Sequence, residues 1–167
     1  ASEPGKGTTF TIFLPAGMAS DRHGDDRPAE AVRVGWGKIL VMDDDQVVRD
    51  LVREMLTILG YEVCVTKDGG EAVNAFKEHQ EEGRPFDAVI MDLTIPGGIG
   101  GKDVVGRLRE LDSGVRAIVS SGYCHDPIMG DFRKYGFSGV LPKPYTAAEM
   151  GKALRAVMNG KKREIAN

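Results

Sequence analysis

The clearest structural signal in the chain is the stretch Asp87-Ala-Val-Ile-Met-Asp-Leu-Thr-Ile-Pro-Gly-Gly-Ile-Gly-Gly101. Residues 88–91 form a short apolar run, which is typical of a parallel strand buried on both faces. The run ends at Asp92, after which Pro96 and four glycines predict a loop that leads into a helix. Since sites in open α/β sheets lie beyond the carboxyl ends of the strands, Asp92 is expected at the rim of a sheet. On this stretch alone, a capping or turn aspartate is an equally good interpretation.

The alternation of strand and helix patterns continues on both sides of this stretch. Apolar runs predict strands at residues 39–42, 61–66, 88–91, 115–119 and 139–141. Helical spacing of apolar residues predicts helices at about residues 47–59, 71–82, 102–111, 127–135 and 146–158. Thr146, with Glu149 three residues on, predicts a capping box for the last helix. Five β–α units in succession predict an α/β fold, a doubly wound five-stranded parallel sheet with helices on both faces.

Polar residues mark the ends of four of the predicted strands. Asp43 and Asp44 follow the first strand, Asp92 the third, Ser120 the fourth and Lys143 the fifth. In a doubly wound sheet these strand ends meet at one rim. Three neighbouring carboxylates repel one another unless a cation lies between them, and hard oxygen ligands suit Mg²⁺. A carboxylate can accept a phosphoryl group as a nucleophile, while a lysine and a serine hydroxyl bind the phosphoryl oxygens.

Each of these residues also has an ordinary structural interpretation. The acidic run at residues 43–45 could stabilise the amino-terminal end of a helix. Ser120 could be a turn residue, and Lys143 could be a surface lysine between two prolines. All of these alternatives would have to hold at the ends of successive strands. We therefore favour a joint functional site, in which Mg²⁺ and the lysine neutralise charge on a phosphoryl group that is transferred to a carboxylate.

Residues 37–160 resemble a response-regulator receiver domain. The motifs that carry the resemblance occur in the family's order, and they are Asp43-Asp44, Met91-Asp-Leu-Thr-Ile-Pro96, Ser120 and Lys143-Pro144. The resemblance implies a CheY-like, flavodoxin-like sheet of order 2-1-3-4-5 and a cis peptide bond between Lys143 and Pro144. It also implies that Asp92 is the phosphoacceptor, with Ser120 and Lys143 as catalytic partners. The metal ligands that it implies are Asp43, Asp44, Asp92 and the backbone carbonyl of Thr94.

The same resemblance implies a place in a two-component phosphorelay. The partner would be a kinase or phosphotransfer domain that carries a phosphohistidine, and the receiver would catalyse only its own phosphorylation and dephosphorylation. The family often has an aromatic switch residue three positions before the lysine, and this position holds Val140 here. The aromatic residues that could take its place are Tyr123 and Tyr145.

Two other functions are compatible with the same fold. The first is a protein-interaction module that works without phosphorylation, which the complete set of acidic, serine and lysine residues argues against. The second is a haloacid-type phosphohydrolase, whose chemistry normally needs a second aspartate two residues after the nucleophile. Thr94 occupies that position, so the phosphohydrolase is the weaker alternative.

Residues 1–16 resemble the end of a histidine-kinase ATPase domain. A glycine-rich box and a final strand carry the resemblance, through Gly5, Gly7, Thr8, Phe10 and Leu14-Pro15. Residues 8–14 are expected to form that strand because they alternate and are rich in β-formers. The rest of such a domain is missing, so we expect no ATP binding here. With a linker at residues 17–36 and a tail at 161–167, the chain looks like the carboxyl-terminal part of a hybrid sensor histidine kinase, a transferase.

The composition is that of a globular domain, with 41% hydrophobic and 28% charged residues among 167. A net charge of -3 predicts no nucleic-acid partner. No apolar run approaches the ~20 residues of a membrane span, so no membrane contact is expected. The two cysteines, Cys64 and Cys124, make neither a disulfide framework nor a metal site. These features favour a cytoplasmic setting.

Overall fold

The computed structural model describes residues 2–11, 35–122 and 126–159. The chain divides into two units, Ala1–Val32 and Arg33–Asn167, and each is described by itself. Most of the predicted linker and the predicted tail lie outside the described residues, as do Tyr123 and Cys124. Among the described residues, none of the helices has the length and apolar character needed to cross a membrane.

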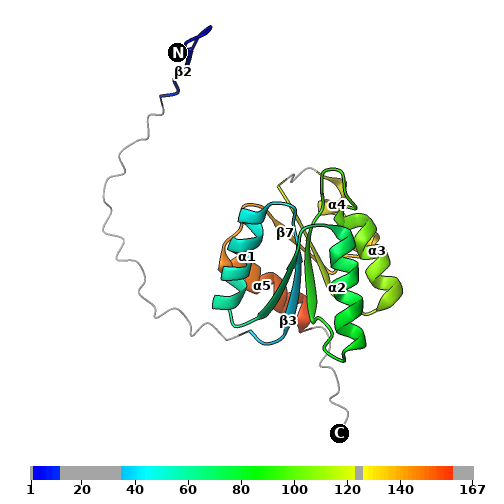
Figure 1. Cartoon of the computed structure of the whole chain (residues 1–167). Coiled ribbons are helices and arrows are strands. Elements are labelled where there is room, and N and C mark those ends of the chain that lie inside the picture. The colour runs from blue at the N-terminus through cyan, green and yellow to red at the C-terminus, as the bar shows by residue number, and fades with distance from the viewer. Residues whose placement is uncertain (1, 12–34, 123–125, 160–167) are drawn as a thin grey trace, which may run out of the picture. The chain divides into compact units, whose positions relative to one another are not determined.

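The larger unit is built on a five-stranded parallel sheet (Figure 1). Its strands are β3 Lys38–Met42, β4 Glu62–Thr66, β5 Ala88–Asp92, β6 Ala117–Ser121 and β7 Gly139–Pro142. They lie in the order β4-β3-β5-β6-β7, and every neighbouring pair is parallel. In chain order this is 2-1-3-4-5, so the predicted doubly wound α/β fold is confirmed.

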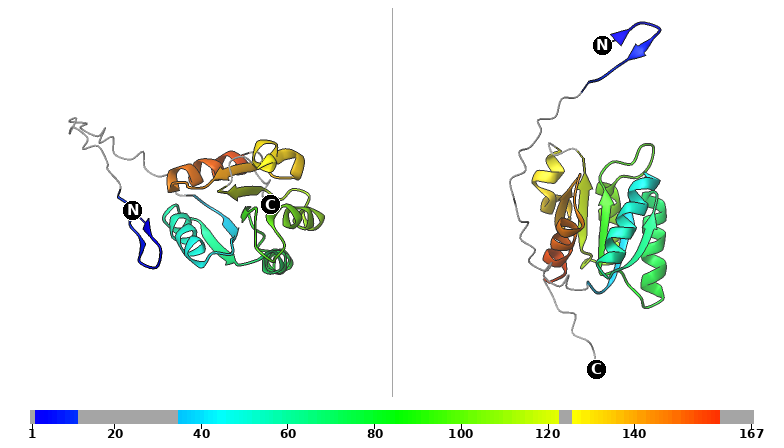
Figure 2. Two further views of the ribbon diagram at one scale, coloured as in Figure 1. Left: turned by 90° about the horizontal axis from the view of Figure 1, so that it is seen from above. Right: turned by 90° about the vertical axis from the view of Figure 1, so that its left-hand side faces the viewer.

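Helices cover both faces of the sheet, as α/β folds require. They are α1 Gln46–Ile58, α2 Gly69–Glu81, α3 Gly101–Leu111, α4 Pro127–Gly130, the 3₁₀ helix η1 Phe132–Tyr135 and α5 Ala147–Met158. Figures 1 and 2 show α1 and α5 on one face and α2 and α3 on the other. The two faces therefore bury two separate groups of apolar side chains.

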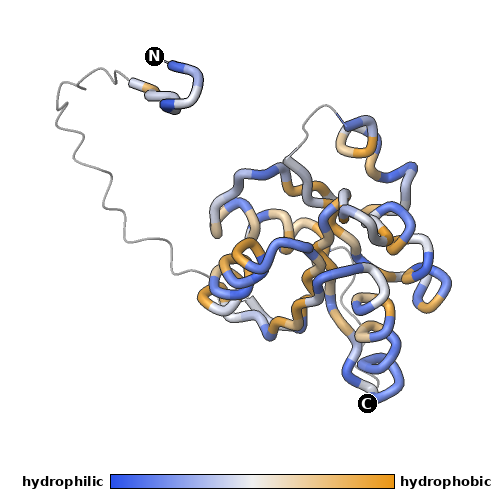
Figure 3. The backbone as a smooth tube through the Cα atoms, turned by 45° about the horizontal axis from the view of Figure 1, so that its top comes forward, coloured by the Kyte–Doolittle hydropathy of each residue, from blue (hydrophilic) through white to orange (hydrophobic). Residues whose placement is uncertain are grey.

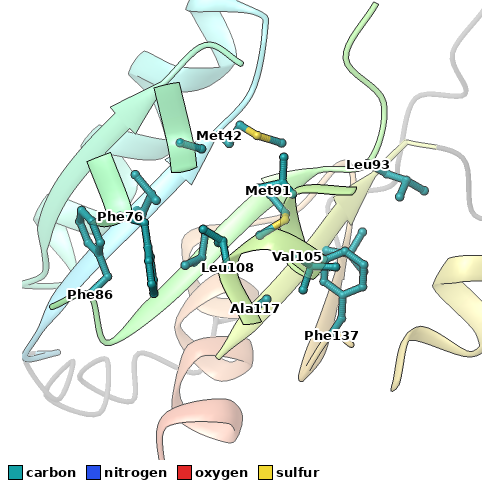
Figure 4. Close-up of a cluster of buried hydrophobic side chains, with 14 of the residues drawn as sticks. Met42, Phe76, Phe86, Met91, Leu93, Val105, Leu108, Ala117 and Phe137 are labelled. Carbon is teal, nitrogen blue, oxygen red and sulfur yellow. The ribbon is translucent and has the colours of Figure 1, made fainter. Parts of the chain in front are cut away.

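The buried side chains alternate between these two groups along each central strand. In β5, Val89 and Met91 face α2 and α3, whereas Ala88 and Ile90 face α1 and α5. Figure 3 shows the hydrophobic colouring concentrated in the strands and on the inner sides of the helices. Figure 4 shows the α2/α3 side, where Phe76, Leu108 and other large side chains fill the layer between sheet and helices. Full burial of such a side chain contributes about 1.5–3 kcal/mol.

Caps fix the starts of the helices nearest to the carboxyl ends of the strands. The Asp45 side chain accepts a hydrogen bond of 2.8 Å from the Val47 backbone N–H, which holds the first turn of α1. At α5, Thr146 and Glu149 form the predicted capping box. The turns that follow β3 and β7 are thereby held in place.

Two predicted elements differ from the structure. The fourth strand was expected at residues 115–119, but β6 runs from Ala117 to Ser121, so Ser120 lies inside the strand and is not a turn residue. The single helix expected at residues 127–135 is wrong as well, because it is divided into α4 and η1. Asp131 interrupts it with a non-helical backbone (φ −127°, ψ 48°).

The described part of the smaller unit is a short antiparallel hairpin, β1 Ser2–Glu3 paired with β2 Gly7–Thr8. Gly5 and Gly7 adopt positive φ angles of 79° and 98°, which lets the glycine-rich segment turn back on itself. The strand predicted at residues 8–14 is therefore wrong where it is described, since only Thr8 is in a strand. Phe10 is 86% exposed, and residues 12–14 lie outside the described part of the chain.

Candidate functional site

The carboxyl ends of β3, β5, β6 and β7 bring the predicted site residues together. Asp92 ends β5 and lies in register with Ser120 on the neighbouring strand β6. Met91 and Leu93, the chain neighbours of Asp92, point into the α2/α3 side of the core (Figure 4). Because side chains alternate along a strand, Asp92 points to the α1/α5 side, towards the turn after β3.

Three carboxylates form an acidic cluster at this rim. Asp43, Asp44 and Asp92 each offer an oxygen, and these oxygens lie within 4.8 Å of one another. Asp43 is buried, with 4% of its surface exposed, whereas Asp44 is exposed and Asp92 is intermediate. The cluster is thus open to solvent on one side and enclosed on the other.

The backbone around Asp43 is held by several hydrogen bonds. The Asp43 N–H donates to the Thr66 carbonyl at 3.2 Å, and the Asp43 Oδ1 accepts from the Asp45 N–H at 3.0 Å. The guanidinium of the buried Arg49 donates to the Asp43 carbonyl at 2.6 Å. Asp43 therefore has little freedom to turn its carboxylate away from the site. Arg49 was not among the predicted site residues, since it acts on a backbone atom and its sequence spacing gives no signal.

Lys143 bridges two carboxylates of the cluster, those of Asp43 and Asp92. Its ammonium nitrogen lies 2.6 Å from Asp43 Oδ2 and 2.6 Å from Asp92 Oδ2. Partial burial works to lower the pKa of Lys143, but the hydrogen bonds to Asp43 and Asp92 outweigh it and hold this pKa above its usual value. The peptide bond between Lys143 and Pro144 is cis, as expected. The lysine therefore stays charged and supplies the positive charge that the carboxylates need.

The loop after Asp92 depends on two glycines. The Asp92 Oδ1 accepts a hydrogen bond of 3.1 Å from the Thr94 N–H, which turns the chain outward. A Cβ at Gly100 would lie 2.6 Å from the Leu93 carbonyl oxygen, and one at Gly101 would lie 2.6 Å from the Asp92 carbonyl oxygen. The start of α3 can approach Asp92 this closely only because both positions lack a side chain.

Ser120 is buried, with 2% of its surface exposed, and its hydroxyl makes no hydrogen bond to any described residue. The Tyr145 phenol lies on the same side of the site. Burial is the main cause that raises the pKa of Tyr145, and the nearby Ser120 hydroxyl acts in the opposite direction. Ser120 thus lies next to the Tyr145 phenol, on the side of β6 that faces the site.

This donor set fits Mg²⁺. The three clustered carboxylates are hard oxygen ligands, and Mg²⁺ binds through a few carboxylates while it keeps waters for a phosphate to replace. A divalent cation would also reduce the electrostatic repulsion among the three carboxylates, which Lys143 reduces in part. The cluster, the lysine and the free hydroxyl together provide a nucleophile and two donors for phosphoryl oxygens.

The sequence matches the response regulator receiver domain over residues 39–155. The chain belongs to this family. Among relatives, it is 28% identical over 166 residues to the sensor kinase CckA of Brucella abortus, covering 94% of this chain but 17% of that protein. It is 27% identical to the chemotaxis protein CheY of Bacillus subtilis, covering 73% of this chain and 98% of that protein.

Solved structures agree with the family. A response regulator receiver domain from Clostridium thermocellum has a TM-score of 0.67 and 26% identity, with 73% of this chain and 94% of that chain covered. The receiver domain of a sensor histidine kinase from Pseudomonas aeruginosa has a TM-score of 0.65 at 24% identity, covering 75% and 99%, and holds a magnesium ion in its active-site cleft. That likeness shows the fold alone.

Membership in the family establishes the general function. This chain carries a receiver domain of the two-component type, and a phosphoacceptor role is consistent with its site. The alternative of a module that works without phosphorylation is not favoured, because the acidic cluster and Lys143 are in place.

Proposed function

We propose that Asp92 accepts the phosphoryl group. The observation that carries the proposal is the pair of 2.6 Å hydrogen bonds from Lys143, one to Asp92 and one to Asp43. They put a fixed positive charge at the one carboxylate of the cluster that ends a central strand and is partly open to solvent. The Asp92 carboxylate can therefore be reached by a phosphodonor from solvent. Negative charge that develops on the phosphoryl group during transfer would be stabilised by the Lys143 ammonium, which is already in position.

In the proposed transfer, an oxygen of Asp92 forms a bond to the phosphorus of a partner's phosphohistidine. The bond between phosphorus and the histidine nitrogen breaks, and its electron pair returns to the ring. Lys143 then donates to a phosphoryl oxygen while it keeps its hydrogen bond to Asp43. Ser120, in register with Asp92, donates its free hydroxyl to another phosphoryl oxygen.

We propose that the residues holding Mg²⁺ are Asp43, Asp44, Asp92 and the carbonyl of Thr94. The clustered oxygens of the three aspartates support this set, and the exposed Thr94 follows Asp92 in the same loop. When bound, the ion would neutralise charge on the transferring phosphoryl group. Asp43 is the most firmly held of these ligands, because Arg49 and Thr66 fix its backbone.

The test of this function is phosphorylation with a small acyl-phosphate donor and Mg²⁺, followed by intact mass spectrometry. We expect the gain of one phosphoryl group, which Asp92→Asn abolishes. Asp50→Asn is the matched control, because Asp50 is an exposed aspartate of α1 whose carboxylate accepts hydrogen bonds from the Gln46 and Arg53 side chains and from none of the proposed site residues that the structure describes. Phosphorylation of Asp92→Asn at the rate of the parent chain would contradict the assignment.

We also propose that the chain is the carboxyl-terminal part of a hybrid sensor histidine kinase, whose transferase activity would not reside in the receiver domain. The match to the sensor kinase CckA covers 94% of the chain, whereas residues 35–167 make up only about four fifths of it. The similarity therefore extends into the segment before Gly35, which supports an ATPase-domain remnant at residues 1–16 and a linker at 17–36. A cytoplasmic location belongs to the same proposal.

A further inference from the structure

Arg49 is a buried charged residue whose charge no adjacent carboxylate balances. Only 8% of its surface is exposed, yet it makes no ion pair with any carboxylate that the structure describes. Its guanidinium donates instead to two neutral oxygens, the Asp43 carbonyl at 2.6 Å and the side-chain carbonyl of Gln46. Burial of an arginine without a paired carboxylate costs free energy, so an arginine at such a place needs another explanation.

Arg49 holds both ends of the turn that carries the acidic pair. Its backbone N–H donates to the Asp45 carbonyl at 3.0 Å, at the start of α1. Its guanidinium reaches back across the same turn to the Asp43 carbonyl. That carbonyl belongs to the planar peptide group that joins Asp43 to Asp44, so its orientation decides the direction in which the Asp44 side chain leaves the backbone. One residue therefore fixes the backbone on both sides of Asp44.

The Asp44 carboxylate depends on this backbone for its direction. Asp44 is exposed, and no residue in the described ranges donates a hydrogen bond to its carboxylate. The Asp43 carboxylate, by contrast, accepts from the Asp45 N–H through one oxygen and from the Lys143 ammonium through the other. Because Mg²⁺ demands near-ideal octahedral geometry, the fit of the two carboxylates to one ion depends on how their shared peptide group is held.

We propose that Arg49 is a positioning residue for Mg²⁺, which holds the peptide group between Asp43 and Asp44 so that one ion can bind both carboxylates. Ligands that are already in place lose less conformational freedom on binding, which raises the affinity for the ion. Gln46 orients Arg49 in turn, because its side-chain oxygen accepts from the second arm of the planar guanidinium. This role rests on the proposed function of Asp43 and Asp44 as metal ligands.

Two other roles of Arg49 would give different results. If the guanidinium acted mainly through its charge, it would repel a cation, and its removal would tighten the binding of Mg²⁺. If it only filled space beside the sheet, its removal would lower the stability of the fold and leave the affinity for Mg²⁺ unchanged. The positioning role is the one that requires weaker binding of Mg²⁺ once the guanidinium is gone.

Isothermal titration calorimetry of the full chain with Mg²⁺ separates the three roles. We expect Arg49→Met to raise the Kd for Mg²⁺ on the order of 10-fold, a loss typical of residues that orient metal ligands. Arg49→Lys keeps the charge and one donor, so it should recover part of this affinity. Arg53→Met is the matched control, since it removes the same charge from the exposed side of α1, where Arg53 donates to Asp50. The control should bind Mg²⁺ as the parent chain does.

A Kd of Arg49→Met that is equal to or lower than that of the parent chain would overturn the inference. Circular dichroism without metal shows whether this variant is folded. If it is not, Gln46→Ala decides, because Gln46 is exposed and its truncation frees the guanidinium without removing it. We then expect a Kd raised about threefold, as for the loss of one hydrogen bond. A Kd like that of the parent chain would again overturn the inference.

The parent chain distinguishes this inference from the proposed metal site. If the parent chain does not bind Mg²⁺, the metal site itself fails and the role of Arg49 fails with it. If the parent chain binds Mg²⁺ and a folded Arg49→Met binds it equally well, the metal site stands and the role of Arg49 alone is refuted.

Discussion

Lys143 and Asp92 lie 2.6 Å apart, although 51 positions separate them in the chain and β6 lies between the strands that carry them. The contact exists because parallel strands deliver their carboxyl ends to the same rim. Lys143 makes an equal contact with the buried Asp43. One ammonium thus balances two carboxylates.

Removal of that ammonium should weaken both the fold and phosphotransfer. Lys143→Met keeps the length of the side chain but leaves Asp43 and Asp92 without their counter-charge. We expect a loss of about 1–3 kcal/mol in the free energy of unfolding, measured with urea in the absence of Mg²⁺. The rate of phosphorylation should fall on the order of 100-fold. Lys152→Met, at an exposed position of α5, is the control and should change neither quantity.

Mg²⁺ should stabilise the folded chain, since the acidic cluster proposed to bind it exists only in the native state. At a free concentration 100 times its Kd the gain is ~2.7 kcal/mol. We expect the Tm to rise across a Mg²⁺ titration at constant ionic strength. Asp44→Asn should reduce this response without lowering the Tm of the metal-free protein, because Asp44 is exposed. A Tm that is insensitive to Mg²⁺ would argue against a metal site.

The glycine at the start of α3 should be intolerant of a side chain. A Cβ at Gly101 would lie 2.6 Å from the Asp92 carbonyl oxygen, so Gly101→Ala has to displace the backbone at Asp92, the proposed phosphoacceptor. We expect a lower Tm and slower phosphorylation. Gly106→Ala in the same helix is the control, because nothing lies within 4 Å of its new Cβ. That change should stabilise the protein by about 0.5–1 kcal/mol. Equal behaviour of the two variants would contradict the role given to Gly101.

The amino-terminal unit should be dispensable for phosphotransfer. The described hairpin, β1 with β2, contains none of the site residues. We expect a chain that begins at Gly35 to fold, as judged by circular dichroism, and to gain a phosphoryl group at the rate of the full chain. Loss of phosphorylation in a shortened protein that is still folded would show that residues 1–34 have a role beyond that of an ATPase-domain remnant.

The sequence was sufficient to predict which side chains meet at the site. Asp43, Asp92 and Lys143 each stand at the end of an apolar run, and the rule for parallel sheets brings such ends together without further information. The cis peptide before Pro144 followed from the family resemblance. The structure confirms that these three side chains meet and that the peptide bond is cis.

Other features depend on tertiary contacts that the sequence pattern does not contain. The break between α4 and η1 occurs at Asp131, which has no helix-breaking signature of the strength of proline. The bond from Arg49 to the Asp43 carbonyl has no motif, since any residue could supply the carbonyl. The strand expected at residues 8–14 had the right alternation, but β-propensity depends on a sheet to pack against.

Chemical trapping tests most directly whether Asp92 carries the phosphoryl group. Borohydride reduces an acyl phosphate on aspartate to homoserine, and peptide mass spectrometry then locates the changed residue. After treatment with Mg²⁺ and a small acyl-phosphate donor, we expect homoserine at position 92 and none at positions 43 and 44. Homoserine at either acidic-pair position, with an unchanged residue at position 92, would contradict it.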